Sequence, residues 1–302
     1  MNNQTIVTTA KDMKIRDVVA LMSFNEVSVE PYSYRKQINS IYGAVNLGWK
    51  HMLYFDATLR GDQSSTLPIS NNMYIYPSFS GSFVFSELLK LGDKLPYGKV
   101  RMSWAQVGSD TDPYQLGLVY TKSKFAYPGY TIGYISNGTI PNKDLKPTKT
   151  NSFEMGLELK FLKNRIGLDF TYYSQLSKNQ IMGMASSSTS GYGYRLINAG
   201  EIENKGVEIA LNTRPIQTKD FSWDLNFNFS KNSNKVKKLV DDMDMFELEK
   251  ATWLDVQVAA KVGENFGSIV GPDFQRNENG DILIDPSTGL PMYDKSNHVL
   301  GN

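Results

Sequence analysis

The sequence has no cysteine and only two histidines, His51 and His298, among its 302 residues. Without cysteine, disulfide scaffolds, thiolate zinc sites and cysteine nucleophiles are excluded. Two histidines are too few for a multi-histidine metal site. An excess of one charge is also missing, because 32 Lys and Arg residues balance 31 Asp and Glu residues and leave a formal net charge of +1. This balance gives no reason to expect nucleic acid as a partner.

Long hydrophobic runs are absent as well. No apolar stretch approaches the ~18 residues of a membrane helix, and the longest lies around residues 18–22. The start of the chain, Asn2-Asn3-Gln4-Thr5, is polar and is followed by no apolar core of a signal peptide. These absences are typical of a soluble protein, but the order of the residues indicates something else.

Apolar and polar residues alternate along most of the chain, which is the period of a β-strand. In residues 41–49, for example, Ile41, Val45 and Trp49 share one face, while Tyr42 and Asn46 share the other. The alternation predicts about eight strands of roughly ten residues each. They are expected over residues 41–49, 53–60, 78–85, 99–104, 152–160, 165–173, 207–212 and 221–229.

Strands of this length can cross a bilayer when tilted. Their apolar faces carry large and aromatic residues, and the opposite faces carry charges, as expected for a lipid-facing wall around a wet lumen. A soluble β-sandwich or propeller would also alternate. The connections favour the membrane barrel, because short and long ones follow each other as in outer-membrane barrels. The shorter ones are residues 50–52, 87–98, 162–164 and 215–220, and the longer ones are 61–77, 108–147, 176–204 and everything after 231.

The polar faces carry side chains that either line a transport path or simply belong to a paired and solvated wall. For any single residue, the second interpretation is favoured. The set comprises Tyr54, Asp56, Arg60, Arg101, Glu154, Glu158, Asp169 and Glu208. The sequence nominates no catalytic, cofactor-binding or metal-binding residue, and it leaves the substrate-binding residues unassigned.

Eight strands alone are expected to be part of something larger. An eight-stranded barrel is filled by its own side chains and leaves no channel. An open sheet in hydrocarbon leaves edge N–H and C=O groups unpaired, at several kcal/mol each. The sequence therefore predicts a piece of a larger barrel.

A set of segments follows one order and spacing along about residues 35–302. They are residues 38–43, 60–68, 76–87, 145–147, 151–158, 161–166, 169–173, 197–200 and 204–208. Together, in one register, they resemble the barrel of SusC/RagA-type TonB-linked outer-membrane transporters of Bacteroidota.

The resemblance implies an all-β fold, an antiparallel transmembrane barrel of about 22 strands with a plug in its lumen. Residues 1–302 are then expected to be a fragment of the barrel domain, without the plug domain, the signal peptide and the closing C-terminal strands. It implies a cell outer-membrane transporter, not an enzyme and without a cofactor, that imports oligosaccharides or peptides. The implied partners are a SusD-like surface lipoprotein, the TonB–ExbB–ExbD complex acting through the plug, and outer-membrane lipid. Two alternatives stay open: a soluble extracellular β-domain that binds glycan, and a non-functional transporter remnant.

Some local motifs have simpler interpretations. Arg60-Gly61-Asp62 spells an adhesion tripeptide but lies at the end of a predicted strand. Asn279-Gly280 resembles part of a calcium loop, yet the required acidic positions are missing, so a hairpin turn is predicted.

Three further stretches are predicted to lie in extracellular loops. Residues 186–192 form a flexible loop whose tyrosines are candidates for stacking on sugars. Residues 235–244, with Lys235, Lys237, Lys238, Asp241, Asp242 and Asp244, form a solvated loop. The first 30 residues, with Met13, Val18 and Met22, form a short helix.

Overall fold

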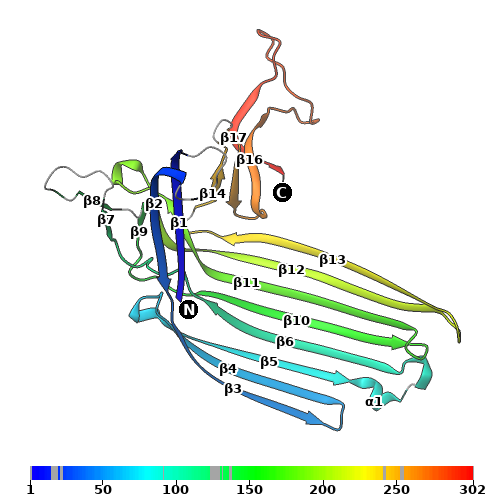
Figure 1. The fold of residues 1–302 in the computed structure, drawn as a ribbon. Helices are drawn as coiled ribbons and strands as arrows, with labels where there is room; N and C mark the ends of the chain where they lie inside the picture. The colour runs from blue at the N-terminus through cyan, green and yellow to red at the C-terminus, as the bar shows by residue number, and fades with distance from the viewer. Residues whose placement is uncertain are drawn as a thin grey trace.

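The fold is that of a computed structural model, which describes residues 2–14, 20, 23–90, 92–122, 130, 132–135, 138–240, 243–251 and 255–301. It is built almost entirely of β-strands (Figure 1). Within the described ranges, no helix is both long and apolar enough to cross a membrane.

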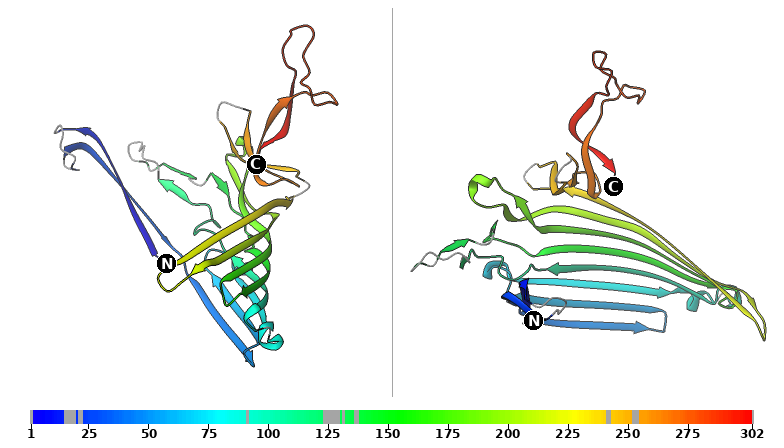
Figure 2. Two further views of the ribbon diagram at one scale, coloured as in Figure 1. Left: turned by 90° about the vertical axis from the view of Figure 1, so that its right-hand side faces the viewer. Right: turned by 45° about the horizontal axis from the view of Figure 1, so that its top comes forward.

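A large sheet dominates the molecule. Eight of its strands follow one another in the order β13-β12-β11-β10-β6-β5-β4-β3, and every neighbouring pair is antiparallel. The strands are β3 (Ile38–Trp49), β4 (Leu53–Ser64), β5 (Met73–Val84), β6 (Tyr97–Ser109), β10 (Thr148–Phe161), β11 (Ile166–Ala185), β12 (Tyr194–Gln217) and β13 (Ser222–Lys238). The short β9 (Thr139–Ile140) pairs with the start of β12 in parallel. The predicted set of about eight strands is confirmed, and the sheet curves as an open arc (Figure 2, left).

The register keeps like side chains in line across the sheet. Val100 of β6 lies opposite both Phe83 of β5 and Leu157 of β10, and Leu157 lies opposite Phe170 of β11. No register shift interrupts the pairing from β3 to β12; shifts occur only between β12 and β13. Because side chains alternate between faces with a period of two, this register collects the apolar residues on one face and the polar residues on the other.

The connections are sorted by length between the two ends of the sheet. At one end lie short turns at residues 50–52, 162–165 and 218–221, and a connection containing α1 (Phe85–Leu89) and η3 (Gly92–Lys94). At the other end lie residues 65–72 with η2 (Ile69–Asn71), residues 110–147 with β7 (Tyr120–Lys122) and β8 (Gly133–Ile135), and residues 186–193 with η4 (Ser188–Ser190). We call these the short-turn end and the long-loop end.

Several predicted boundaries are wrong. The predicted connection 61–77 is only 65–72, because β4 and β5 extend further than predicted. Phe85 does not end a strand but begins α1. Residues 176–204 are not mainly a loop, because β11 and β12 extend far beyond the bilayer-sized segment and are joined by residues 186–193 alone. Ser, Asn and Gly residues in this stretch hide its strand character, and the long antiparallel pairing with 19 aligned residue pairs overrides their local preference.

The predicted N-terminal helix is also wrong. The described part of this region forms two antiparallel strands, β1 (Asn2–Met13) and β2 (Phe24–Arg35), which stand away from the large sheet (Figure 2). Met13 lies in β1, whereas Val18 and Met22 lie outside the described residues. Three Thr residues in β1, and two Val and two Tyr residues in β2, favour extended backbone over helix.

A small four-stranded sheet follows β13 at the long-loop end. It contains β14 (Met245–Lys250), β15 (Gln257–Lys261), β16 (Phe266–Phe274) and β17 (Tyr293–Gly301), in that order. Lys235, Lys237 and Lys238 lie in β13 and not in the predicted loop; Asp244 precedes β14, and Asp241 and Asp242 are outside the described residues. The predicted turn at Asn279-Gly280 is confirmed, with Gly280 at φ 88° and its N–H donating to the Asn277 carbonyl at 3.0 Å.

The buried cores lie at the long-loop end and not behind the large sheet. One cluster contains Leu67, Tyr74, Leu145 and Leu196 and joins two of the long connections, 65–72 and 110–147, to β5 and β12. The other contains Val236, Leu239, Phe246 and Ala260 and joins the small sheet to the top of β13. The apolar face of the large sheet itself carries exposed side chains, so it has no second protein layer over it among the residues described.

Candidate functional site

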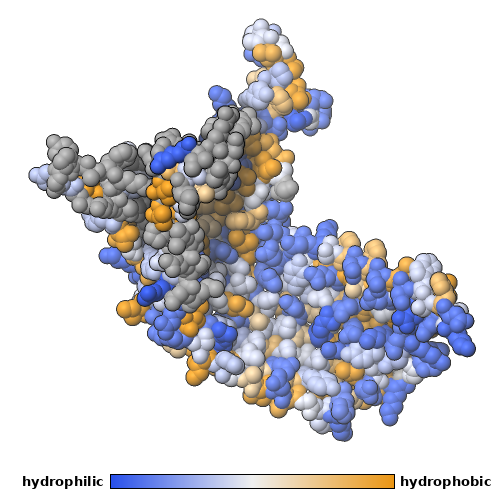
Figure 3. All heavy atoms as spheres, in the orientation of Figure 1, coloured by the Kyte–Doolittle hydropathy of each residue, from blue (hydrophilic) through white to orange (hydrophobic). Residues whose placement is uncertain are grey.

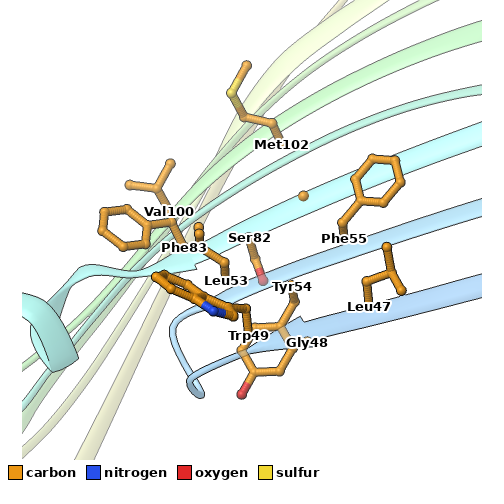
Figure 4. Close-up of a pocket in the computed structure, with 11 residues that line it drawn as sticks. Leu47, Gly48, Trp49, Leu53, Tyr54, Phe55, Ser82, Phe83, Val100 and Met102 are labelled. Atoms are coloured by element: carbon orange, nitrogen blue, oxygen red, sulfur yellow. The ribbon is translucent and has the colours of Figure 1, made fainter.

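The outer face of the large sheet is an exposed apolar band. Ile41 is 76% exposed, Leu59 56% and Phe227 60%, although all three lie within regular, paired strands. Near the short-turn end, this face is hollowed into an apolar groove of 510 Å³. Figure 4 shows Trp49, Leu53, Phe83 and Val100 gathered there beside α1. A monomeric protein rarely leaves such a surface to water, but it matches hydrocarbon.

Aromatic rings mark the short-turn edge of this band. Trp49 ends β3, and Phe221 and Trp223 lie at the matching end of β13, all three exposed. The Lys50 ammonium lies 4.7 Å from the centre of the Trp49 ring. Indole rings with a neighbouring cation are typical of the membrane–water interface, where one side of the ring is apolar and the other is wet.

The inner face is polar and is held together by side-chain bonds between strands. Figure 3 looks onto this side, where hydrophilic residues cover most of the large sheet. Arg101 of β6 donates to both carboxylate oxygens of Asp169 in β11, at 3.0 and 2.7 Å, and to the Thr171 hydroxyl at 2.7 Å. It reaches them across β10, directly over Gly156, where a Cβ would lie 2.4 Å from Arg101 Nε. A glycine on the middle strand therefore allows one guanidinium to connect three strands.

Most of the polar residues singled out from the sequence are paired within the wall. Asp56 accepts a hydrogen bond from Ser80 at 3.0 Å and another from Asn46. Glu158 lies 3.6 Å from the Lys160 ammonium. Tyr54 lies along Gly48 of the neighbouring strand. Glu154 and Glu208 form no ion pair within 4.0 Å in the part of the chain that the structure describes, and Glu208 lines a polar hollow of the inner face together with Arg101 and Asp169.

The adhesion-like tripeptide belongs to the same wall. Arg60 Nε donates to Asp62 at 2.9 Å within β4, and Asp62 is buried and also accepts a hydrogen bond from the Tyr76 hydroxyl. A side chain already bonded in this way does not present a recognition tripeptide to another protein.

A polar cluster around Asp110 at the long-loop end was not among the predicted features. This carboxylate accepts from the Lys36 ammonium at 2.6 Å, from Thr66 at 3.2 Å and from Ser64. It ties the connection after β6 to the ends of β2 and β4. Asp110 lies in a stretch without periodicity, so only the fold brings its partners together.

Nothing in the described ranges resembles a metal centre, since no three His, Cys, Asp or Glu side chains gather there.

These two faces, the antiparallel register and the sorted connections define the wall of an outer-membrane β-barrel. The family described as TonB dependent receptor-like, beta-barrel matches residues 10–268, and the chain belongs to this family. Its members are receptors and transporters, and the chain is a component of the cell outer membrane.

Curated relatives and solved structures agree with this assignment. The chain is 30% identical to TonB-dependent receptor SusC of Bacteroides thetaiotaomicron over 71% of its own length and 22% of that protein. It is 29% identical to TonB-dependent receptor P3 of Formosa agariphila over 82% of its length and 26% of that protein. Its fold matches the structure of the RagAB peptide transporter with a TM-score of 0.77 and 20% identity, over 100% of this chain and 33% of that one.

The resemblance to SusC/RagA-type transporters is therefore confirmed. The chain spans about a quarter of the length of the curated relatives it matches.

Proposed function

We propose that the chain forms part of the wall and of the extracellular loops of a transporter that imports large nutrients, oligosaccharides or peptides, across the outer membrane. One observation supports this most directly: a continuous polar inner face lies behind an exposed apolar outer face. A barrel that only anchored itself in lipid would not need a wet, largely self-paired inner wall of this width.

The partners follow from the family. A SusD-like lipoprotein would meet the long-loop end, and the TonB–ExbB–ExbD complex would supply energy through a plug inside the barrel. SusC is named a TonB-dependent receptor, and the RagAB structure is titled a peptide transporter. For the present chain both partners, like the substrate class, are proposals. We assign it no catalytic activity.

The free edges of the sheet indicate that further strands complete the wall. The N–H and C=O groups that β3 and β13 direct outward would each cost several kcal/mol in hydrocarbon. We propose that they pair with barrel strands beyond the eight described, and that plug and closing strands belong to the same assembly. Sequencing the DNA on both sides of the reading frame tests this: an in-frame plug and a closing strand support it. Stop codons close to both ends indicate a transporter remnant and would overturn it.

The transport function is tested by deleting the gene and restoring it on a plasmid. Growth should fail on one class of oligosaccharide or peptide, return with the intact gene, and fail equally in a strain without TonB. Unchanged growth on every oligosaccharide and peptide supplied, with the receptor present in the outer membrane of the parent strain, would contradict the proposal.

A further inference from the structure

Two grooves on the outer face of the sheet join into one composite surface. An apolar groove of 750 Å³ lies over β3, β4 and β5. A polar groove of 470 Å³ lies at the long-loop end of the same face. Met73 and Ile75 of β5 line both grooves, so the apolar one runs directly into the polar one.

The apolar groove owes its depth to small residues between large ones. Gly43, Ala57 and Gly61 form its floor, and a Cβ placed on Gly43 would meet nothing within 4 Å. Ile41 and Leu59 stand beside them and are exposed. A trough bordered by branched side chains and floored by glycine fits an extended methylene chain.

The polar groove carries two lysines whose ammonium groups form no ion pair with any residue the structure describes. Lys146 and Lys149 are exposed. Leu145 and Pro147, on either side of Lys146 in the chain, are buried. Asn71 and Asn179 line the same groove with amide groups. The neighbouring Lys178, opposite Lys149 in the register, forms an ion pair with Glu201 at 3.2 Å. Glu201 therefore neutralises Lys178, and the charges of Lys146 and Lys149 stay uncompensated among the described residues.

The backbone that presents Lys146 is held firmly. Asn198 of β12 accepts a hydrogen bond from the Lys146 N–H at 2.7 Å and donates one to the Lys146 carbonyl at 2.7 Å. Leu145 beside it has no exposed surface and lies in the buried cluster at the long-loop end. Because this backbone is already buried and held by the two hydrogen bonds of the Asn198 amide, little conformational entropy of the backbone is lost when a ligand binds.

We propose that this composite groove binds one phosphorylated lipid of the outer leaflet. Lys146 and Lys149 would hold the phosphate, Asn71 and Asn179 would hydrogen-bond the headgroup, and an acyl chain would lie along Met73, Ile75 and the glycine floor. Two unpaired cations at the extracellular edge of a lipid-facing band match an anionic headgroup, and the apolar trough below matches its chain. The groove faces hydrocarbon and not the inner wall, so a transported nutrient does not reach it. The inference goes beyond transport and depends only on the outer-membrane orientation.

The test uses the full-length receptor purified in detergent, with its bound lipid counted by native mass spectrometry. The probes are monophosphoryl lipid A and the same lipid after removal of its phosphate. The receptor should prefer the phosphorylated form, and the double variant Lys146→Gln/Lys149→Gln should lose that preference by about 30-fold, since each cation near an anionic surface contributes about fivefold.

The matched control is Lys99→Gln/Lys160→Gln, which removes the same charge from the inner face at the short-turn end of β6 and β10, away from the groove. It should bind both probes like the parent protein. If the control loses as much phosphorylated lipid as the groove variant, or if the groove variant loses none, the proposal is wrong.

A third variant separates the contribution of the lipid headgroup to binding from that of the acyl chain. Gly61→Leu fills the trough, where a Cβ meets only Ile41, Ile75 and Met73 at 3.7 to 4.0 Å. This substitution should lower the affinity for both lipids equally and leave the preference for the phosphorylated form unchanged. Inorganic phosphate alone should neither bind detectably nor displace the lipid; displacement by free phosphate would contradict a lipid site. These readouts are independent of uptake, so a failure here leaves the transport proposal intact.

Discussion

At the scale of single residues, glycines let long side chains lie flat against the inner wall. Arg101 lies over Gly156 to reach Asp169, and Tyr173 lies over Gly206 so that its hydroxyl donates to Asn232 at 3.1 Å. In both cases a side chain crosses one strand to bind the next. Each of these bonds therefore stabilises the inner wall across three strands, while the side chain that forms it lies flat against the sheet.

The substitution Gly156→Ala tests this arrangement. The new Cβ would displace the guanidinium and break its bonds to Asp169, at a cost of about 1–3 kcal/mol in the free energy of unfolding. In an Arg101→Ala background the same substitution should be nearly neutral. Urea titration of the full-length receptor in vesicles gives the double-mutant cycle, with Gly43→Ala as a control in open space. Equal costs in both backgrounds would refute the account of Gly156.

Neighbouring residues on β10 should respond oppositely to the same charge. Leu157→Arg puts a cation into hydrocarbon near the middle of the band, at about 2–4 kcal/mol. Glu158→Arg points inward, beside Lys160, and should cost less than about 1 kcal/mol because water screens the exposed charges. Equilibrium unfolding of the two variants measures the difference, and equal costs would mean that the faces are assigned wrongly.

A carboxylate in β17 provides a pH test outside the membrane. Hydrogen bonds from the Ser296 hydroxyl and N–H, and then from His298, lower the pKa of Asp294 to about 2 from its usual 3.8. The folded form is thus favoured by ionisation above pH 3.8, and this contribution is lost as the pH falls toward 2. The carbon-13 shift of the carboxyl group should titrate near 2, and in Ser296→Ala the midpoint should rise toward 3.8. An unchanged midpoint would show that Ser296 is not the cause.

At the scale of elements, the strand segments of bilayer length can be predicted from the sequence, whereas most of the strands and loops outside the bilayer cannot. In residues 153–157 the apolar and polar side chains alternate because one side meets lipid and the other water, and this pattern is readable without a fold. The outer halves of β11 and β12, the hairpin of β1 and β2, and the cluster around Asp110 depend on long-range pairing. Local composition carries no record of such partners, so they could not be predicted.

The small sheet should unfold independently of the wall. Phe246 of β14 is 8% exposed and lies in the cluster that joins this sheet to β13, so Phe246→Ala should remove about 3–5 kcal/mol of local stability. Limited proteolysis should then cleave within residues 245–301 while the barrel remains intact. Leu248→Ala, in the same strand but 37% exposed, is the control. Loss of the whole barrel on Phe246→Ala would contradict separate units.

At the scale of the whole molecule, the two faces of one sheet decide where the protein resides. A soluble sandwich would cover its apolar face with a second layer, whereas this sheet leaves that face open to lipid. Membranes that contain the receptor should keep it after washing with alkaline carbonate. Release into the wash, with a known outer-membrane barrel retained in the same sample, would favour the soluble alternative.

Accessibility of single cysteines along β10 tests the central claim most directly. These 302 residues contain no cysteine. In the full-length receptor, with any cysteine outside them replaced by serine, a spin label is placed at each position from 153 to 160. Collisions with oxygen should peak at 153, 155, 157 and 159, and collisions with a water-soluble nickel chelate should peak at the positions between them. A pattern without this period of two, or with the two peaks exchanged, would contradict the account.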